Sequence, residues 1–195
     1  MVVMRCKRSD QSGYSALELV VVMGIMVTIS VVVLLGFGTL NDTVAVNRSA
    51  RDLAVSLRRA QNMSLAVRGV TAVGGEVPPA VGIQLTKAGA SYIVFADRAL
   101  SRDFKYMSSS GELIEIIRFE RNVIVADFLD ASGSPFTPAG NVLHIIYSSP
   151  EADPRMTDGD GIGGASLAKV EIVLRSPNGK EKKVIVRESG QISVQ

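Results

Sequence analysis

An uncharged, strongly apolar run near the amino terminus constrains the fold of this chain more than any other feature. No charged residue occurs from Leu19 to Asn41, and Leu19 to Leu35 is almost entirely Val, Ile, Leu and Met. About 20 apolar residues in a helix, at a rise of 1.5 Å each, can cross the roughly 30 Å hydrocarbon core of a bilayer. We therefore expect residues 14–40 to form a membrane-spanning helix.

One carboxylate, Glu18, lies at the start of this run, five residues after Gly13. An ionised side chain in a bilayer costs roughly 2.5–3.5 kcal/mol on insertion scales, so such a residue usually has a partner. The nearest basic residues, Arg5, Lys7 and Arg8, lie on the other side of Gly13. Because basic residues precede the span and none follows it closely, we expect the amino terminus in the cytoplasm and the remainder outside it.

This arrangement resembles the amino terminus of type IV prepilins, which have a short basic leader, a glycine, an aromatic or apolar residue, and a glutamate at the fifth position of a hydrophobic helix. The resemblance implies that a prepilin peptidase removes residues 1–13 as a leader by cleaving after Gly13. Tyr14, where the family more often has phenylalanine, then becomes an N-methylated amino terminus. In a filament, Glu18 of one subunit would pair with the Tyr14 amine of its neighbour.

Two other interpretations of the apolar run remain open. A secretory signal peptide has an apolar region of about 7–15 residues followed by a small-residue cleavage site, and this run is longer. A plain signal anchor of an exported domain fits the length but leaves Glu18 without a partner.

The leader also contains the residues that make the whole chain formally positive, and it contains the single cysteine. Three of the 21 basic and one of the 19 acidic residues lie in the leader, so the mature chain is formally neutral. The single cysteine, Cys6, is removed with it. The mature chain therefore lacks the carboxyl-terminal disulfide loop of many major pilins, which argues against a major pilin.

Beyond the apolar run, residues 41–68 have the pattern of an amphipathic helix. Apolar residues recur every three or four positions, which places them on one face. They are Val46, Ala50, Leu53, Leu57 and Ala60. We expect the helix to end near Val67, with a local break at Asn41-Asp42-Thr43.

Residues 69–195 are predicted to form a β-rich globular domain. Alternating or β-branched runs indicate strands, and Asn178-Gly179 is a strong signal for a tight hairpin turn. The expected strands are 81–85, 91–96, 113–120, 123–129, 142–148, 168–175, 180–187 and 192–194. The predicted fold class is α+β, a type IV pilin-like fold with a long amino-terminal helix packed on an antiparallel sheet or sandwich.

Three stretches resemble minor pseudopilins of the GspH/FimT type: 50–66, Ile146–Glu151 and Lys183–Val194, although Gln191 stands where the family usually has arginine. The resemblance implies a minor subunit of a type II secretion pseudopilus or a type IV pilus. Its partners would be prepilin peptidase, other pilin subunits, the inner-membrane assembly platform and membrane lipid. It would cross the cytoplasmic (inner) membrane once, with its carboxyl-terminal domain in the periplasm or outside the cell.

Two further patterns have a functional and a plainer interpretation. Asp158 and Asp160, in a Gly-rich acidic loop, could supply oxygen ligands to calcium, but the spacing does not fit an EF-hand and we expect a loop without metal. His144, the only histidine, lies in an apolar run, where we expect a hydrogen-bonded strand residue. Without another base no catalytic set can be assembled, so we expect neither enzymatic activity nor a cofactor.

The basic residues near the carboxyl terminus carry the main competing function. Some FimT-type minor pilins take up DNA, and Lys180, Lys182, Lys183 and Arg187 could bind its phosphates. Glu181 and Glu188 interrupt this run, and no aromatic residues for base stacking lie nearby. We expect a solvated strand face here, with DNA binding as the alternative.

Overall fold

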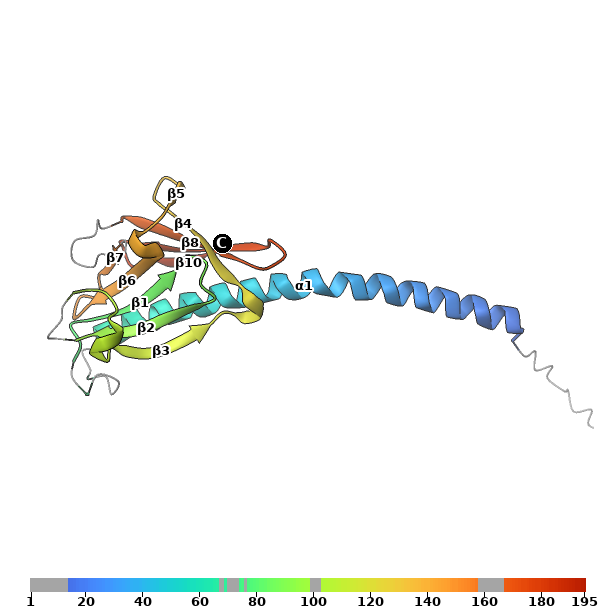
Figure 1. The fold of residues 1–195 in the computed structure, drawn as a ribbon, viewed down its shortest axis with the longest axis horizontal. Coiled ribbons are helices and arrows are strands. Elements are labelled where there is room, and N and C mark those ends of the chain that lie inside the picture. Colours follow the sequence, from blue (N-terminus) through green and yellow to red (C-terminus); the bar gives the residue numbers. More distant parts are fainter. Residues whose placement is uncertain (1–13, 67–68, 70–73, 76, 99–102, 158–166) are drawn as a thin grey trace, which may run out of the picture. The chain divides into compact units, whose positions relative to one another are not determined.

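The computed structural model describes residues 14–66, 69, 74–75, 77–98, 103–157 and 167–195, without the side chains of 35–40. The chain divides into two compact units, Met1–Leu40 and Asn41–Gln195. The fold class is α+β, as predicted: one long helix belongs to both units, and the second unit contains two antiparallel sheets (Figure 1).

Helix α1 (Ala16–Leu65) has 50 residues. The break expected at Asn41-Asp42-Thr43 is absent, because all three residues are helical. Although these residue types have low helix propensity, tertiary contacts override it. Here the Asp42 carboxylate accepts a hydrogen bond from Asn178 and lies 3.7 Å from the Arg121 guanidinium.

The first sheet has the strand order β3-β2-β1-β6-β7, with antiparallel pairing throughout. Its strands are β1 (Ala80–Thr86), β2 (Ser91–Asp97), β3 (Leu113–Arg118), β6 (Val142–Ser148) and β7 (Pro154–Thr157). The strands predicted at 81–85 and 91–96 are confirmed, and they pair as the β1–β2 hairpin. β7 was not predicted, because it is short and begins at a proline, which is typical of an edge strand.

The second sheet has the order β10-β9-β8-β4-β5 and is also antiparallel. Its strands are β4 (Ile124–Leu129), β5 (Pro135–Phe136), β8 (Lys169–Arg175), β9 (Glu181–Arg187) and β10 (Ile192–Val194). The predicted Asn178-Gly179 turn joins β8 to β9, and Gly179 has the positive φ of 79° that such turns require. Only the two-residue β5 was missed in this sheet.

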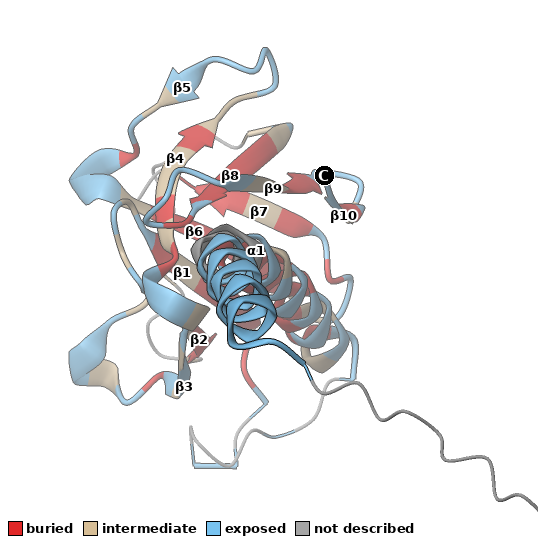
Figure 2. Cartoon of the chain, turned by 90° about the vertical axis from the view of Figure 1, so that its right-hand side faces the viewer, coloured by how far each residue is buried: buried red, intermediate tan, exposed pale blue. Residues whose placement is uncertain are grey.

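The core of the second unit is formed by both sheets and by the carboxyl-terminal half of α1. The predicted apolar stripe is buried, and it packs with strand residues such as Ile83, Phe128 and Val184 (Figure 2). Buried hydrogen bonds add to this packing: the Ser56 and Tyr92 hydroxyls lie 2.8 Å apart, and Ser64 Oγ donates to the Tyr147 carbonyl at 2.9 Å. Burial therefore fixes this half of the helix against the sheets.

Candidate functional site

The amino-terminal half of α1 is the most distinctive surface of the described chain. Ala16–Leu34, 19 residues with a mean hydropathy of 2.7, has no buried residue within the structure. By length and composition this segment can cross a membrane once. A helix that is apolar on all sides belongs inside lipid or inside protein, because water solvates such a surface poorly.

The two hydroxyl side chains within this segment are satisfied by the helix itself. Thr28 Oγ1 donates to the Gly24 carbonyl and Ser30 Oγ to the Met26 carbonyl, both at 2.8 Å. Lipid offers no hydrogen-bond partner, so a hydroxyl there needs one inside the protein. These two residues therefore do not prevent the segment from lying in a bilayer.

Glu18 lies in the first turn of α1, and its surroundings reveal a role that the sequence analysis missed. Ser15 caps the helix: its carbonyl accepts from Leu19 N, and its Oγ accepts from Glu18 N, both at 3.2 Å. Ser15-x-x-Glu18 is the sequence pattern of a capping box, and a carboxylate near a helix amino terminus interacts favourably with the helix dipole. The pattern could have been read from the sequence alone.

Helix capping does not neutralise the charge of Glu18. No basic side chain in the described part of the chain lies within ion-pair distance of its carboxylate. A cationic partner would therefore have to come from elsewhere. Tyr14, the residue expected to become the mature terminus, is 84% exposed, while residues 1–13, the expected leader, lie outside the described residues.

The four basic residues considered for DNA do not form one patch. Side chains alternate along β9, so Lys182 lies on the opposite face from Lys183 and Arg187. Lys180 lies before the strand, at the end of the β8–β9 turn. Lys183 Nζ is 3.1 Å from Glu171 Oε2, and hydrogen bonds from Lys169 and then Lys183 lower the pKa of Glu171. This arrangement does not favour a continuous phosphate-binding face.

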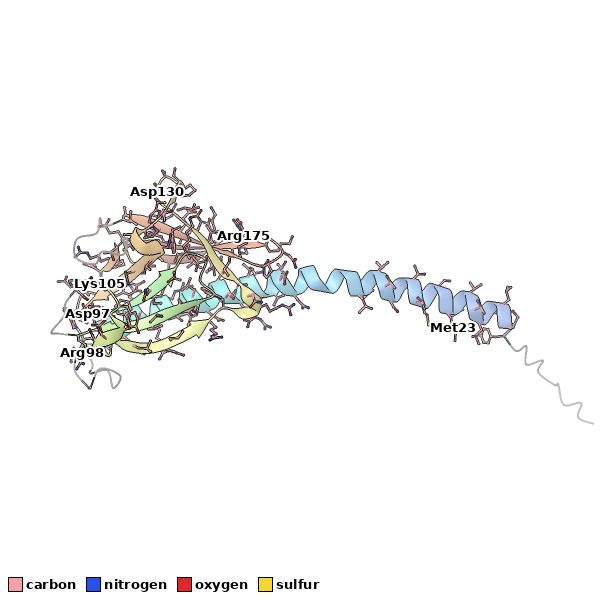
Figure 3. The ribbon with its side chains drawn as sticks, in the orientation of Figure 1. Met23, Asp97, Arg98, Lys105, Asp130 and Arg175 are labelled. Atoms are coloured by element: carbon pink, nitrogen blue, oxygen red, sulfur yellow. The ribbon has the colours of Figure 1, made fainter. Side chains whose placement is uncertain are left out.

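Asp158 and Asp160 lie outside the described residues. A different acidic cluster, which the sequence analysis missed, brings carboxylate oxygens of Asp97, Asp103 and Glu112 within 4.8 Å of one another. In Figure 3 Asp97 is labelled at the left-hand end of the second unit. No spacing rule marks these residues, because the end of β2 and the connection to β3 bring them together.

Hydrogen bonds explain why two of these carboxylates are buried. Asp97 Oδ2 accepts from Phe104 N at 3.2 Å, and Glu112 Oε2 accepts from Met107 N at 2.9 Å. Phe104 and the nearby Tyr106 pack against the face of the first sheet that points away from the main core. The carboxylates therefore position this segment on the sheet, and that role does not require a metal ion.

The expectation that His144 is hydrogen-bonded is wrong. It is buried on the outer face of β6, and neither ring nitrogen has a hydrogen-bond partner among the described residues. Its ring lies edge-on to that of Phe95, with ring centroids 6.0 Å apart. Its register partners on the two adjacent strands are Gln84 in β1 and Thr157 in β7. Each of these residues also has a buried side-chain oxygen without a hydrogen-bond partner among the described residues.

Burial lowers the pKa of His144 to about 4, so the imidazole is neutral at pH 7. No hydroxyl or carboxylate in the described chain is hydrogen-bonded to it. The geometry therefore does not present His144 as the base of a catalytic set.

Comparison of the chain with models of protein families, with characterised proteins and with solved structures found no match.

Proposed function

We propose that this protein is a membrane-anchored structural subunit of a pilus-type filament, a minor pilin or pseudopilin of type IV pilin-like fold. One observation carries the proposal: an apolar helix segment, entirely unburied, has a single carboxylate in its first turn. The β-rich unit, with its own core, would be displayed outside the cytoplasm. The proposed role is structural and not catalytic.

The physical argument concerns what can replace lipid around this helix. A segment that is apolar on every side can leave a bilayer only for another apolar environment, such as a bundle of similar helices in a filament. In lipid the Glu18 carboxylate has no basic partner among the described residues of its own chain. In a filament, the amine of a processed neighbouring subunit can neutralise it. Transfer into the filament therefore removes an unfavourable charge, which would contribute to assembly and set the register between subunits.

Replacing Glu18 tests this mechanism. Glu18→Val should leave membrane insertion intact, measured by resistance to carbonate extraction, and should strongly reduce the amount of protein in sheared filaments. Ser15→Ala is the matched control, because it removes the hydroxyl cap and keeps the carboxylate. If Ser15→Ala reduced incorporation as much as Glu18→Val, capping would explain the effect; normal incorporation of Glu18→Val would contradict the pairing.

Processing can be tested separately at Gly13. Gly13→Val should block the peptidase, so that the protein stays in the membrane at the mobility of the precursor in electrophoresis. A Gly13→Val variant that is shortened to the same size as the wild type would refute cleavage at this site. It would then favour a signal peptide cut elsewhere.

A further inference from the structure

The outer side of the carboxyl-terminal half of α1 has a regular pattern of its own. Seven residues at alternating spacings of four and three are all exposed, and we call them the outer seam. A repeat of seven residues with this spacing lets one helix pack along another. The buried stripe is offset from the seam by two positions, about 200° around the helix. The seam consists of Val44, Arg48, Arg51, Val55, Arg58, Asn62 and Leu65.

Part of the seam is apolar. Three of its seven residues are apolar, and they lie at its two ends and at its middle. Next to the middle residue, Val55, a shallow hollow of about 380 Å³ opens on the helix surface, and the half-buried Met63 extends its apolar floor. At its rim the Arg59 guanidinium is already paired with Glu115, 3.0 Å away. An apolar side chain of a partner would therefore be removed from water in this hollow.

The seam is also basic. It has three arginines and no acidic residue, and Asp52, the single acidic residue of this stretch, lies beside it. Arg48 is 3.8 Å from Glu120. Arg51 and Arg58 have no carboxylate within ion-pair distance among the described residues. A partner with carboxylates at these two positions would supply ion pairs that the described chain does not make for itself.

The same charges disfavour a second copy of this chain as the partner. In a parallel pair each seam residue would face its own counterpart, so Arg51 would face Arg51 and Arg58 would face Arg58. In an antiparallel pair Arg51 of each copy would lie beside Arg58 of the other, since each lies seven residues from one end of the seam. Like charges at facing positions destabilise helix pairs and select against such partners. The seam therefore fits a helix of a different chain.

We propose that the outer seam docks an acidic amphipathic helix of a different filament subunit. The apolar residues of that helix pack on Val55 and on the apolar ends of the seam, and its carboxylates pair with Arg51 and Arg58. That the partner is a filament subunit rests on the proposed function. Nucleic acid fits less well, because three seam positions are apolar and none is aromatic, so these positions offer neither phosphate contacts nor base stacking.

Binding of a synthetic helix to the full-length protein in phosphatidylcholine nanodiscs tests the proposal. The probe is a fluorescent peptide of three heptads, with leucine at positions that face apolar seam residues and glutamate at positions that face arginine. A second peptide has glutamine in place of each glutamate. The acidic peptide should bind about ten-fold more tightly, as expected for two or three exposed ion pairs, and high salt should reduce the difference. Equal affinities, or no binding of either peptide, would overturn the proposal.

Charge reversal at Arg51 provides matched variants. Arg51→Glu should weaken binding of the acidic peptide about five-fold, because an exposed attraction is exchanged for a repulsion of similar size. Arg51→Lys keeps the charge and should bind as the wild type does. Arg58 is a less suitable position, because it also donates to the Ile192 carbonyl at 3.3 Å. A peptide with lysine opposite position 51 should restore binding to Arg51→Glu, and failure of this rescue would contradict the pairing.

Other occupants give different results. A photoreactive amino acid in place of Val55 should crosslink, in native membranes, to a helix of another polypeptide that carries Asp or Glu. A crosslink to a second copy of this chain, or to a helix without carboxylates, would overturn the proposal. Tighter binding of a DNA duplex than of the acidic peptide would overturn it in favour of nucleic acid. A protein that binds the acidic peptide but keeps residues 1–13 would instead contradict the proposed function and leave the docking surface standing.

Discussion

The two halves of α1 both expose apolar residues, but they differ in the surroundings that these residues require. Val27 in the first half is 63% exposed and Val55 in the second is 61% exposed, so exposure alone does not distinguish them. Around Val27 every face of the helix is apolar, whereas Val55 lies opposite a buried stripe that contains Leu53 and Leu57. The first pattern requires an apolar surrounding, and the second requires only one packed face.

The buried stripe should give the largest effect on folding. Leu53 is fully buried between the helix and the sheets, so Leu53→Ala should lower the free energy of unfolding of the second unit by about 2–5 kcal/mol. Val55→Ala, two residues further on, should change it by less than about 0.5 kcal/mol. Chemical denaturation in detergent measures both. Equal losses would show that packing does not distinguish the two faces.

The two equally exposed valines sharpen the comparison further. Val27→Lys places a charge near the middle of the apolar segment and should cost about 3 kcal/mol of membrane insertion. Val55→Lys should alter neither insertion nor the stability of the second unit by more than about 0.5 kcal/mol. Carbonate extraction and denaturation provide the two readouts. An insertion free energy that Val27→Lys leaves unchanged would contradict the position of this segment in hydrocarbon.

His144 should make the second unit sensitive to acid. In the unfolded chain its imidazole titrates near 6.5, but burial lowers the pKa to about 4 in the folded chain, with smaller and opposing contributions from Asp103 and Lys105. Between these pH values the unfolded chain binds more protons, so the free energy of unfolding falls as the pH decreases. The loss between pH 6.5 and 4 should reach about 3 kcal/mol.

His144→Leu provides the control for this pH dependence. Carboxylates also titrate in acid, so the informative quantity is the difference between wild-type and variant unfolding free energies at each pH. That difference should change by about 3 kcal/mol between pH 6.5 and 4. Parallel curves would mean that His144 is not held neutral by burial.

The smallest expected difference in unfolding free energy is between alanine substitutions at two serines, one in each half of α1. Ser64 Oγ donates to the Tyr147 carbonyl across the core, so Ser64→Ala should cost about 1 kcal/mol of unfolding free energy and leave a buried acceptor unpaired. Within the described residues Ser30 Oγ bonds only to its own helix, and Ser30→Ala should change stability by less than about 0.5 kcal/mol. A larger effect at Ser30 would indicate an interhelical partner for its hydroxyl.

The sequence predicted those parts of the fold that depend on local periodicity. The buried face containing Leu53 and Leu57 and most of the strands follow directly from the spacing of apolar residues. β7 was missed because it is a short edge strand starting at Pro154, and the helix break near Asp42 was wrong because a contact with Asn178, distant in sequence, stabilises the helix there.

The candidate sites were less predictable, because they depend on contacts between distant segments. Ser15-x-x-Glu18 is the sequence pattern of a capping box, which was readable but overlooked, and the Ser15 hydroxyl does accept from Glu18 N. The cluster of Asp97, Asp103 and Glu112 and the unpartnered nitrogens of His144 could not be read, since the register of the strands and the path of their connections determine them.

The central claim is that the amino-terminal half of α1 is the processed, filament-forming part of the protein. Intact-mass and amino-terminal sequence analysis of the protein extracted from native membranes tests this claim directly. The account predicts a mature chain that lacks residues 1–13 and begins at Tyr14 with a methyl group on its amine. A chain that begins at Met1, or an unmodified terminus produced by cleavage beyond the apolar segment, would contradict it.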